Sequence, residues 1–384
     1  MPPGRNLRGR SCSEARNDTR DAIAASNSAV AMALVIAGSY EGGLHGWTFD
    51  NDNYELKFSF AAHQGCIRCV ATNSHVADAQ PLLLTGGDDE VIRAFSLSSF
   101  RQLGELSKHA GTVTDLCFCG SKHFASASAD GTILLWRLKE WTCVHVLGGH
   151  DKPVHSVDAH PSGRMLLSTG ADRTLRLWDL VEGRGAHITR TKGESTKVCW
   201  NGPATSYLLI LGARVEVLDV ETSTTEFDMD VGARVLDACF LAGTDFVATA
   251  DGAGCMSVWS AQGCVWRRSR RGGGRVKALA GLRVGPCDQC ASLDAWAASF
   301  RLVAAASSGA AEAWAPAGPA DDIDDEAAAA PAAVAAGTTA RLTCLAVHAV
   351  SGRPRSNSSF SGEASKRGLK DKLKRKRARS RSDV

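Results

Sequence analysis

The sequence lacks an apolar run long enough to cross a membrane, since no stretch of 18 apolar residues occurs among its 384 residues. The N-terminal part also lacks the continuous apolar core of a secretory signal. Neither a GxxxxGK(S/T) phosphate loop nor an HExxH motif is present. We therefore expect neither a membrane-spanning nor a secreted protein, and the motifs give no support to a P-loop nucleotide hydrolase or a zinc protease.

The 13 cysteines do not have the pattern of a disulfide framework. Most lie inside apolar runs such as DLCF at 115–118, where a free thiol behaves as a small hydrophobic side chain. Cys66/Cys69 and Cys287/Cys290 have the spacing of zinc ligands, but the first pair falls in a predicted strand, where residues three apart face opposite sides. We therefore expect no bound metal, no other cofactor and a reducing compartment.

Charge is divided unevenly along the chain. Residues 365–384 contain 10 basic and 2 acidic residues, a charge of +8, whereas the other residues contain 34 basic and 39 acidic ones, a charge of −5. Such a division predicts two surfaces with different partners. Residues 1–31 are rich in Arg, Ser and Ala, but their acidic residues argue against a transit peptide. We expect a disordered or mis-assigned leader that adds nothing to the fold, with Met32 as a candidate start.

A repeat with a closing aromatic residue runs through most of the chain. The aligned positions are Trp47, Phe95, Trp136, Trp178, Leu218, Trp259 and Trp314. The middle intervals are 40–42 residues, the first is 48 and the last is 55. Period-2 strands separated by turns at this spacing are typical of β-propeller blades. The sequence therefore predicts seven repeats.

Three of the repeats carry the same polar residues at the same offsets. An Asp stands six residues before the closing aromatic, a Ser or Thr stands four before that Asp, and a His opens the unit. Buried imidazole, hydroxyl and carboxylate groups satisfy one another's hydrogen bonds. Because the set recurs at one spacing, we interpret it as a structural tetrad and expect no catalysis and no enzyme. The tetrads are His63, Thr85, Asp89 and Phe95; His109, Ser126, Asp130 and Trp136; and His150, Ser168, Asp172 and Trp178.

The other repeats depart from this pattern. The Asp position is Ala253 before Trp259 and Ser308 before Trp314, and Leu218 replaces the aromatic residue in a third repeat. We expect these blades to depend on apolar packing and on their neighbours.

The tetrads resemble those of the WD-repeat family, and the resemblance implies an all-β, seven-bladed WD-repeat β-propeller over residues 32–350. The first repeat lacks an opening strand, whereas 340–350 has the alternation of one. We therefore expect a closing blade built from 32–60 plus 340–348. The intervening 316–339 contains DDIDDE and an Ala run, which predict a flexible, solvated insert or, alternatively, an acidic hook for a basic partner.

Two basic segments are candidates for contact with nucleic acid. The tail at 351–384 is expected to be disordered, and its basic run is either a nuclear or nucleolar address, an RNA-binding arm, or both; the alternative is a solubility tail. Its basic residues are Lys366, Arg367, Lys370, Lys372, Lys374, Arg375, Lys376, Arg377, Arg379 and Arg381. A second cluster flanks Gly272–Gly274 and is either a solvated turn or a phosphate contact with RNA. Its members are Arg267, Arg268, Arg270, Arg271 and Arg275.

Three segments carry a closer resemblance. HPSGRMLLSTGADRTLRLWDLVEGR at 160–184, ARLTCLAV at 340–347 and MALVIAGSYEG at 32–42 resemble the PAK-interacting-protein-like WD-repeat proteins. The resemblance implies a scaffold in the nucleus and nucleolus that assists large-ribosomal-subunit assembly and pre-rRNA maturation. It implies contacts with pre-ribosomal particle proteins and rRNA, made by a monomeric propeller within a complex. It also implies an alternative role, binding and inhibiting a p21-activated-type protein kinase, for which no residue gives independent support.

Overall fold

The computed structural model describes residues 33–50, 53–73, 80–269, 274–283, 293, 300–316, 331, 333–335 and 340–349. The chain divides into a unit of Met1–Ser351 and a unit of Gly352–Val384, and the second unit lies outside the described residues. The predicted leader at 1–31 and the predicted tail at 351–384 therefore lie outside them as well. Within the described ranges, no helix is long and apolar enough to cross a membrane.

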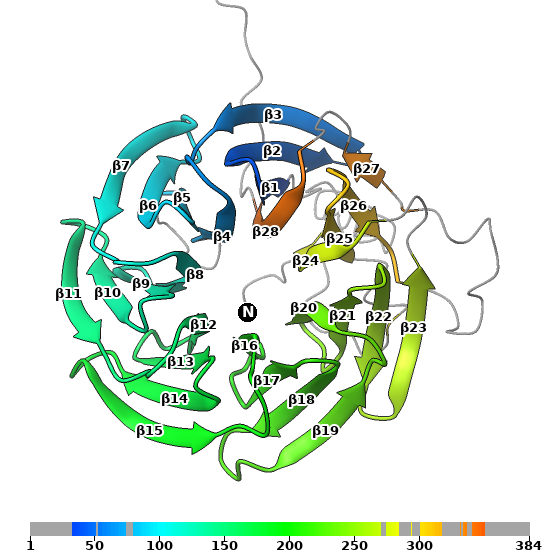
Figure 1. The fold of residues 1–384 in the computed structure, drawn as a ribbon. Helices are drawn as coiled ribbons and strands as arrows, with labels where there is room; N and C mark the ends of the chain where they lie inside the picture. Colours follow the sequence, from blue (N-terminus) through cyan, green and yellow to red (C-terminus); the bar gives the residue numbers. More distant parts are fainter. Residues whose placement is uncertain are drawn as a thin grey trace, which may run out of the picture. The chain divides into compact units, whose positions relative to one another are not determined.

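Seven antiparallel sheets of four strands are arranged in a ring (Figure 1). The prediction of an all-β, seven-bladed propeller is confirmed. Six blades take four consecutive strands each, with the first strand innermost and the last outermost. Blade 1 consists of β4 (Ile67–Thr72), β5 (Leu82–Gly87), β6 (Val91–Ser96) and β7 (Arg101–Ser107). Blade 2 consists of β8 (Val113–Cys119), β9 (His123–Ser128), β10 (Ile133–Arg137) and β11 (Thr142–Leu147). Blade 3 consists of β12 (Val154–Ala159), β13 (Met165–Gly170), β14 (Thr174–Asp179) and β15 (Arg184–Arg190).

The next three blades follow the same order. Blade 4 consists of β16 (Lys197–Trp200), β17 (Ser206–Leu211), β18 (Arg214–Asp219) and β19 (Thr225–Asp230). Blade 5 consists of β20 (Val235–Phe240), β21 (Val247–Asp251), β22 (Cys255–Ser260) and β23 (Gly263–Ser269). Blade 6 consists of β24 (Val276–Arg283), β25 (Phe300–Ala306), β26 (Ala311–Trp314) and β27 (Ala333–Ala335).

Burial along a blade follows the position of the strand. The second strands are covered on both faces by neighbouring blades, so they consist of apolar and small residues, as in LLLTGG of β5. Close approach accounts for the small residues, since a Cβ added at Gly86 would lie 2.6 Å from Val113 Cγ1 of blade 2. The outermost strand β15, RGAHITR, is exposed along its whole length. Polar and charged residues are tolerated there because only one edge and part of one face contact protein.

The seventh blade takes strands from two distant parts of the chain. β28 (Leu342–Ala349) is its innermost strand, followed by β1 (Ala33–Ser39), β2 (Gly43–Asp50) and β3 (Asn53–Ala61). β28 pairs with β1 in antiparallel register from Ala33↔Ala349 to Gly38↔Cys344. The Thr343 hydroxyl oxygen also lies 3.1 Å from Gly38 O. The pairing removes the free strand edges that an open ring would expose.

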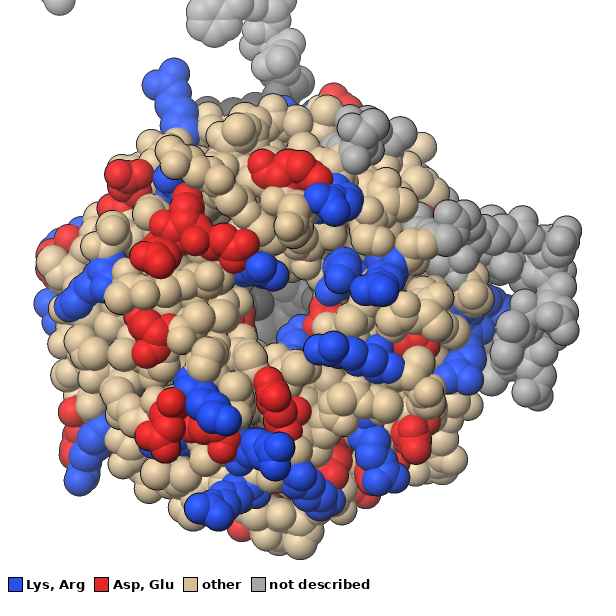
Figure 2. All heavy atoms as spheres, viewed as in Figure 1, with Lys and Arg blue, Asp and Glu red and all other residues tan. Residues whose placement is uncertain are grey.

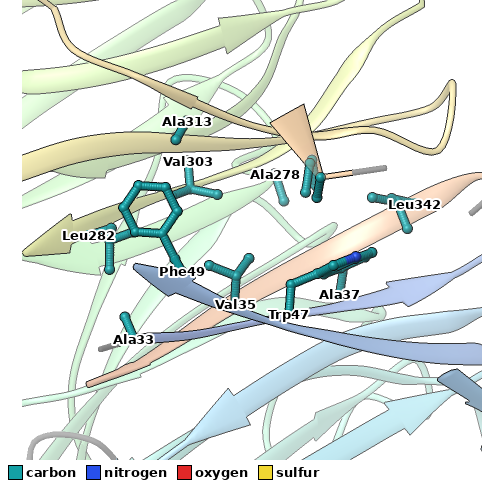
Figure 3. Packing of buried hydrophobic residues seen from close by; sticks show 13 residues of the cluster. Ala33, Val35, Ala37, Trp47, Phe49, Ala278, Leu282, Val303, Ala313 and Leu342 are labelled. Atoms are coloured by element: carbon teal, nitrogen blue, oxygen red, sulfur yellow. The ribbon is translucent and has the colours of Figure 1, made fainter. Parts of the chain in front are cut away.

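An apolar seam joins this closing blade to blade 6 (Figure 3). Val35, Trp47 and Phe49 of the closing blade pack with Leu282 and Val303 of blade 6, and all five are almost fully buried. Burying a side chain such as Val35 or Phe49 stabilises the fold by about 1.5–3 kcal/mol relative to leaving it exposed. The ring is therefore closed by strand pairing and by a continuous core.

The expectation that all of 316–339 is a solvated insert is wrong at one place. Ala333–Ala335 form β27, which pairs with β26 as the outer strand of blade 6. Ala335 is 3% exposed and belongs to the apolar seam. A run of alanines can do this because strand pairing uses backbone groups, and a methyl side chain fits where two blades lie close together. The acidic residues 321–326 lie outside the described residues.

Candidate functional site

Blades 2 and 3 each contain a complete hydrogen-bonded tetrad. In blade 3, His150 Nδ1 lies 2.8 Å from Asp172 Oδ2 and its Nε2 lies 2.8 Å from Ser168 Oγ. Trp178 Nε1 donates to the same Ser168 Oγ at 2.8 Å. Blade 2 repeats the arrangement: His109 Nδ1 lies 3.0 Å from Asp130 Oδ2, and its Nε2 lies 2.8 Å from Ser126 Oγ. Trp136 Nε1 donates to the same Ser126 Oγ at 2.9 Å. The tetrad ties the loop before the first strand to the second and third strands.

Blade 1 keeps the network but replaces its indole. His63 Nδ1 lies 2.8 Å from Asp89 Oδ1, and Nε2 lies 2.7 Å from Thr85 Oγ1. Phe95 has no N–H to donate, so Thr85 receives no hydrogen bond of the kind that Trp178 makes. Instead, the Arg93 guanidinium donates to Asp89 Oδ2 at 2.6 Å. Phe95 contributes only apolar packing, at 4% exposure.

The electrostatics of the tetrads favour a fixed structural role. Burial lowers the pKa of His150, although Asp172 opposes the effect, so the imidazole is neutral at pH 7. Burial disfavours ionised Asp172, but hydrogen bonds from Thr174 and His150 outweigh it and lower the pKa of the carboxyl. A neutral imidazole donates from Nδ1 to the carboxylate and accepts the Ser168 hydroxyl proton at Nε2. Ser168 is fully buried, so its hydroxyl has no access to a substrate.

Blade 5 retains part of a tetrad in a form that the alignment did not predict. Trp259 Nε1 donates to Thr249 Oγ1 at 3.0 Å, which matches the indole–hydroxyl bond of the complete tetrads. Ala253 occupies the aligned acidic position, but Asp251 accepts from the backbone N–H groups of Ala253 and Cys255 at 2.9 and 2.8 Å. Blade 5 therefore holds its turn with a carboxylate placed two residues earlier, and does not depend on apolar packing alone.

A second set of carboxylates links the innermost strands of neighbouring blades. Asp115 Oδ2 accepts from Val157 N at 3.0 Å, Asp158 Oδ2 from Trp200 N at 2.8 Å, and Asp237 Oδ2 from Leu279 N at 2.7 Å. In each case the donor lies 42 residues further along the chain. These residues were not among the predicted site residues, although an Asp inside an apolar strand, as in VLDACF, is a usable signal in the sequence.

Burial shifts the pKa of two of these inner carboxyls. It raises the pKa of Asp158 to about 6, and it also raises that of Asp115. Asp237 forms an ion pair with Lys197 of blade 4. Burial disfavours the Lys197 ammonium, but the Asp237 carboxylate outweighs this and raises the pKa of the lysine.

The central channel opens at two mouths. The first, on the side of the tetrad histidines, contains a hollow of about 660 Å³ lined by Tyr40, Arg68, Arg275, Lys277 and Arg341. In the view of Figure 2, Lys and Arg side chains border the opening on the side where β24 lies in Figure 1. The opposite mouth contains a hollow of about 690 Å³ whose lining includes aromatic and thiol side chains, among them Phe118, Cys117, His160, Cys199 and Trp200. The first mouth is cationic, and the second is more apolar.

The predicted arginine cluster is only partly available for RNA. Arg268 is 4% exposed, so the expectation that it contacts RNA is wrong for this side chain. Arg267 is half-buried, donating from Nε to Ser257 Oγ at 3.1 Å and from a terminal nitrogen to Val231 O at 3.2 Å. Both lie on β23, where successive side chains point to opposite faces of the sheet, and composition cannot indicate which face is buried. Arg275 is exposed, and Arg270 and Arg271 lie outside the described residues.

The CxxC pairs give no metal site in the part of the chain that the structure describes. Cys66 precedes β4 and Cys69 lies within it; both are buried, and burial raises the pKa of both thiols. No group of three or more His, Cys, Asp or Glu residues that could hold a metal ion occurs among the described residues. Cys287, Cys290 and the basic tail residues lie outside them.

The comparisons with known proteins agree with this architecture. The model of the family described as WD domain, G-beta repeat matches residues 100–137 and 141–179. The chain is 32% identical over 215 residues to the p21-activated protein kinase-interacting protein 1-like of Gallus gallus, covering 54% of this chain and 55% of that protein. It is 30% identical over 217 residues to the Homo sapiens p21-activated protein kinase-interacting protein 1, covering 54% of each. Protein MAK11 of Saccharomyces cerevisiae is 31% identical over 222 residues, covering 50% of this chain and 52% of that protein. The chain thus spans about half the length of the relatives that it matches.

Proposed function

We propose that this WD-repeat protein, related to p21-activated protein kinase-interacting protein 1 and to Protein MAK11, is a non-enzymatic nucleolar scaffold for large-ribosomal-subunit assembly. The observation that carries the proposal is the uneven charge of the chain: residues 1–364 carry a net charge of −5, and residues 365–384 carry +8. A dense basic segment binds RNA by neutralising phosphates and releasing counterions. Pre-ribosomal particles, rich in RNA and in basic proteins, offer a partner to each part of the chain.

The propeller supports this role as a rigid body for protein contacts. The Ser and His side chains of its tetrads are buried and hydrogen-bonded to one another, so they hold the blades together and leave the loops and outer strands free for binding. Its specific contacts are then with particle proteins, and the tail adds RNA affinity without reading bases. In this role the protein assists pre-rRNA maturation by keeping partners in place.

Gradient sedimentation tests the proposal. The full chain, carrying an affinity tag, is sedimented from nuclear extracts at low and moderate salt, and its fractions are analysed for proteins and RNA. We expect co-sedimentation with large-subunit precursors and nucleolar location by microscopy. A protein that stays in the light fractions at both salt concentrations and is excluded from the nucleolus would contradict the proposal.

A second candidate function is regulation of a p21-activated-type kinase. The names of several relatives favour it, including the human protein and Shk1 kinase-binding protein 15 of Schizosaccharomyces pombe, which is 27% identical over 164 residues. In this case we expect the purified chain to bind and inhibit such a kinase in a salt-insensitive way, with most of the protein in the cytoplasm. Kinase assays with the purified chain separate the two functions.

A further inference from the structure

We infer that the first mouth of the central channel binds an acidic segment of a protein partner, through a cationic pocket that the weakened repeats of blades 5 and 6 create. The pocket is the hollow of about 660 Å³ lined by Arg68, Arg275, Lys277 and Arg341 together with Tyr40. These residues come from blade 1, blade 6 and the closing blade, so the ring places them around one opening. The inference rests on the proposed scaffold role and adds the chemistry of a partner.

Two of the four cations are already neutralised. Arg68 donates to both oxygens of Asp88 at 2.7 and 3.1 Å. Arg341 Nε donates to Glu41 Oε1 at 3.0 Å, and its guanidinium lies over the Tyr40 ring, 4.1 Å from the centroid. These contacts orient the two guanidinium groups while leaving each side chain at least half exposed.

Arg275 and Lys277 differ, because no carboxylate of the described residues forms an ion pair with either of them. The backbone of Arg275 is nevertheless fixed, since its N–H donates to Ser307 Oγ at 2.9 Å and its carbonyl accepts from Ser307 N at 2.9 Å. Lys277 lies on β24 and lines the same hollow. Two unpaired positive charges therefore stand at a defined place in the mouth.

The repeat pattern explains why these charges are unpaired. Blades 1, 2 and 3 carry a tetrad Asp in the turn between the second and third strands, on this side of the ring. Blade 5 has Ala253 at that position, and Ala253 lines the pocket; blade 6 has Ser308. Asp251 is 4% exposed, and its carboxylate already accepts hydrogen bonds from backbone N–H groups of its own turn. Loss of the tetrad carboxylate thus leaves a net positive charge on one side of the mouth.

The surroundings favour an acidic peptide over a nucleic-acid backbone. Asp88, Asp89 and Glu90 stand on the turn of blade 1, and Glu41 lies on the closing blade, so carboxylates border the pocket on two sides. In Figure 2, acidic side chains gather over blade 1, facing the cationic edge across the opening. An extended chain of phosphates would meet these carboxylates, whereas one or two acidic side chains fit between Arg275 and Lys277 and avoid them.

Peptide binding by the full chain tests the inference. The probe is a fluorescent peptide of alternating Glu and Gly, titrated with wild type and with the double variant Arg275→Ala/Lys277→Ala at moderate salt. We expect the double variant to bind about three- to tenfold more weakly, as loss of two exposed ionic contacts predicts. The variant Ala253→Asp, which places the repeat's carboxylate beside the two cations, should weaken binding in the same direction without removing a cation.

The matched control is Lys122→Ala/Lys139→Ala, which removes two exposed lysines from turns of blade 2 that do not line the pocket, and it should bind the peptide like wild type. In every chain compared, the ten Lys and Arg residues of 366–381 are changed to Gln, so that the tail offers no competing site for the acidic peptide. Equal peptide affinity for wild type and both pocket variants would overturn the inference, as would an equal loss in the control. So would a pocket variant that loses affinity for single-stranded poly(U) and keeps it for the peptide. Failure of peptide binding while the chain still sediments with precursor particles would refute the pocket and leave the scaffold role standing.

Discussion

At the scale of single residues, a few buried polar groups hold each blade together. Asp172 accepts hydrogen bonds from His150, from the Thr174 hydroxyl at 2.8 Å and from Thr174 N at 3.0 Å. A buried group that loses its partner keeps the full cost of its desolvation. The tetrads are thus more important for stability than surface ion pairs, which contribute little.

Replacing Asp172 by Ala should lower the free energy of unfolding by about 1–3 kcal/mol, because His150 and Thr174 lose their acceptor in a buried place. Denaturant titration followed by tryptophan fluorescence measures the change. Asp245→Ala, at an exposed residue with no hydrogen bond among the described residues, is the matched control and should change stability by less than about 0.5 kcal/mol. Equal stability of the two variants would show that the tetrad does not stabilise blade 3.

Asp158 predicts a specific pH dependence. Burial raises its pKa to about 6 in the folded state, above the ordinary 3.8 expected in the unfolded chain. As pH falls through 6, the folded state takes up a proton that the unfolded state does not, so folding is favoured at the lower pH. Between pH 7.5 and pH 5, wild type should gain on the order of 1 kcal/mol relative to Asp158→Asn, which keeps an oxygen to accept from Trp200 N. A difference that stays constant with pH in parallel urea titrations would refute the raised pKa.

At the scale of strands, the fold depends on the pairing of β28 with β1. The inner strand of the closing blade contacts β1 on one side, and Thr343 donates to Ile67 O of blade 1. Blade 6 reaches the same seam through Ala335 and Val303. The closing blade therefore connects blades 1 and 6, and the ring depends on it.

A chain that ends at residue 339 lacks β28 and should lose cooperative unfolding and tend to associate, because the edge of β1 becomes exposed. A chain that ends at residue 350 retains β28 and should unfold like the full chain. Urea unfolding and size-exclusion chromatography compare the two. Cooperative, monomeric behaviour of the shorter chain would mean that the antiparallel pairing of β28 with β1 is dispensable for the closed ring.

At the scale of the whole molecule, the proposed function is divided between two parts of opposite charge. The chain up to residue 364 carries −5, so we expect its overall charge to repel RNA, and we expect the +8 of residues 365–384 to attract it. The cationic pocket at the first mouth is a local exception that arises from two weakened repeats.

Changing the ten Lys and Arg residues of 366–381 to Gln should abolish retention of RNA at moderate salt and disperse the protein into the cytoplasm. The logarithm of the RNA-binding constant should fall with the logarithm of salt with a slope of at most about 7 in wild type, and much less in the variant. A tail of the same composition in scrambled order is the control, and it should bind as wild type does because the tail reads no bases. An unchanged salt slope in the Gln variant would make the tail a solubility appendage.

The sequence by itself determined the repeat and therefore the fold class. Tetrad residues such as His150, Ser168 and Asp172 recur at fixed offsets because blades 1, 2 and 3 have nearly the same strand lengths and turns, so local spacing reports a tertiary contact. The missing opening strand of the first repeat also indicated the closing segment, since a strand edge inside a ring needs a partner.

Only the tertiary structure decided which side chains are buried between blades and which meet at the channel. Arg268 and Arg275 belong to one basic cluster in the sequence, yet one is buried and the other lines the mouth with Arg68 and Arg341 from distant repeats. Ala335 belongs to a low-complexity run, yet it completes the seam with Val35. The physical reason is that these environments depend on the side-by-side packing of blades, which joins residues far apart in the chain and leaves no periodic signal within a single repeat.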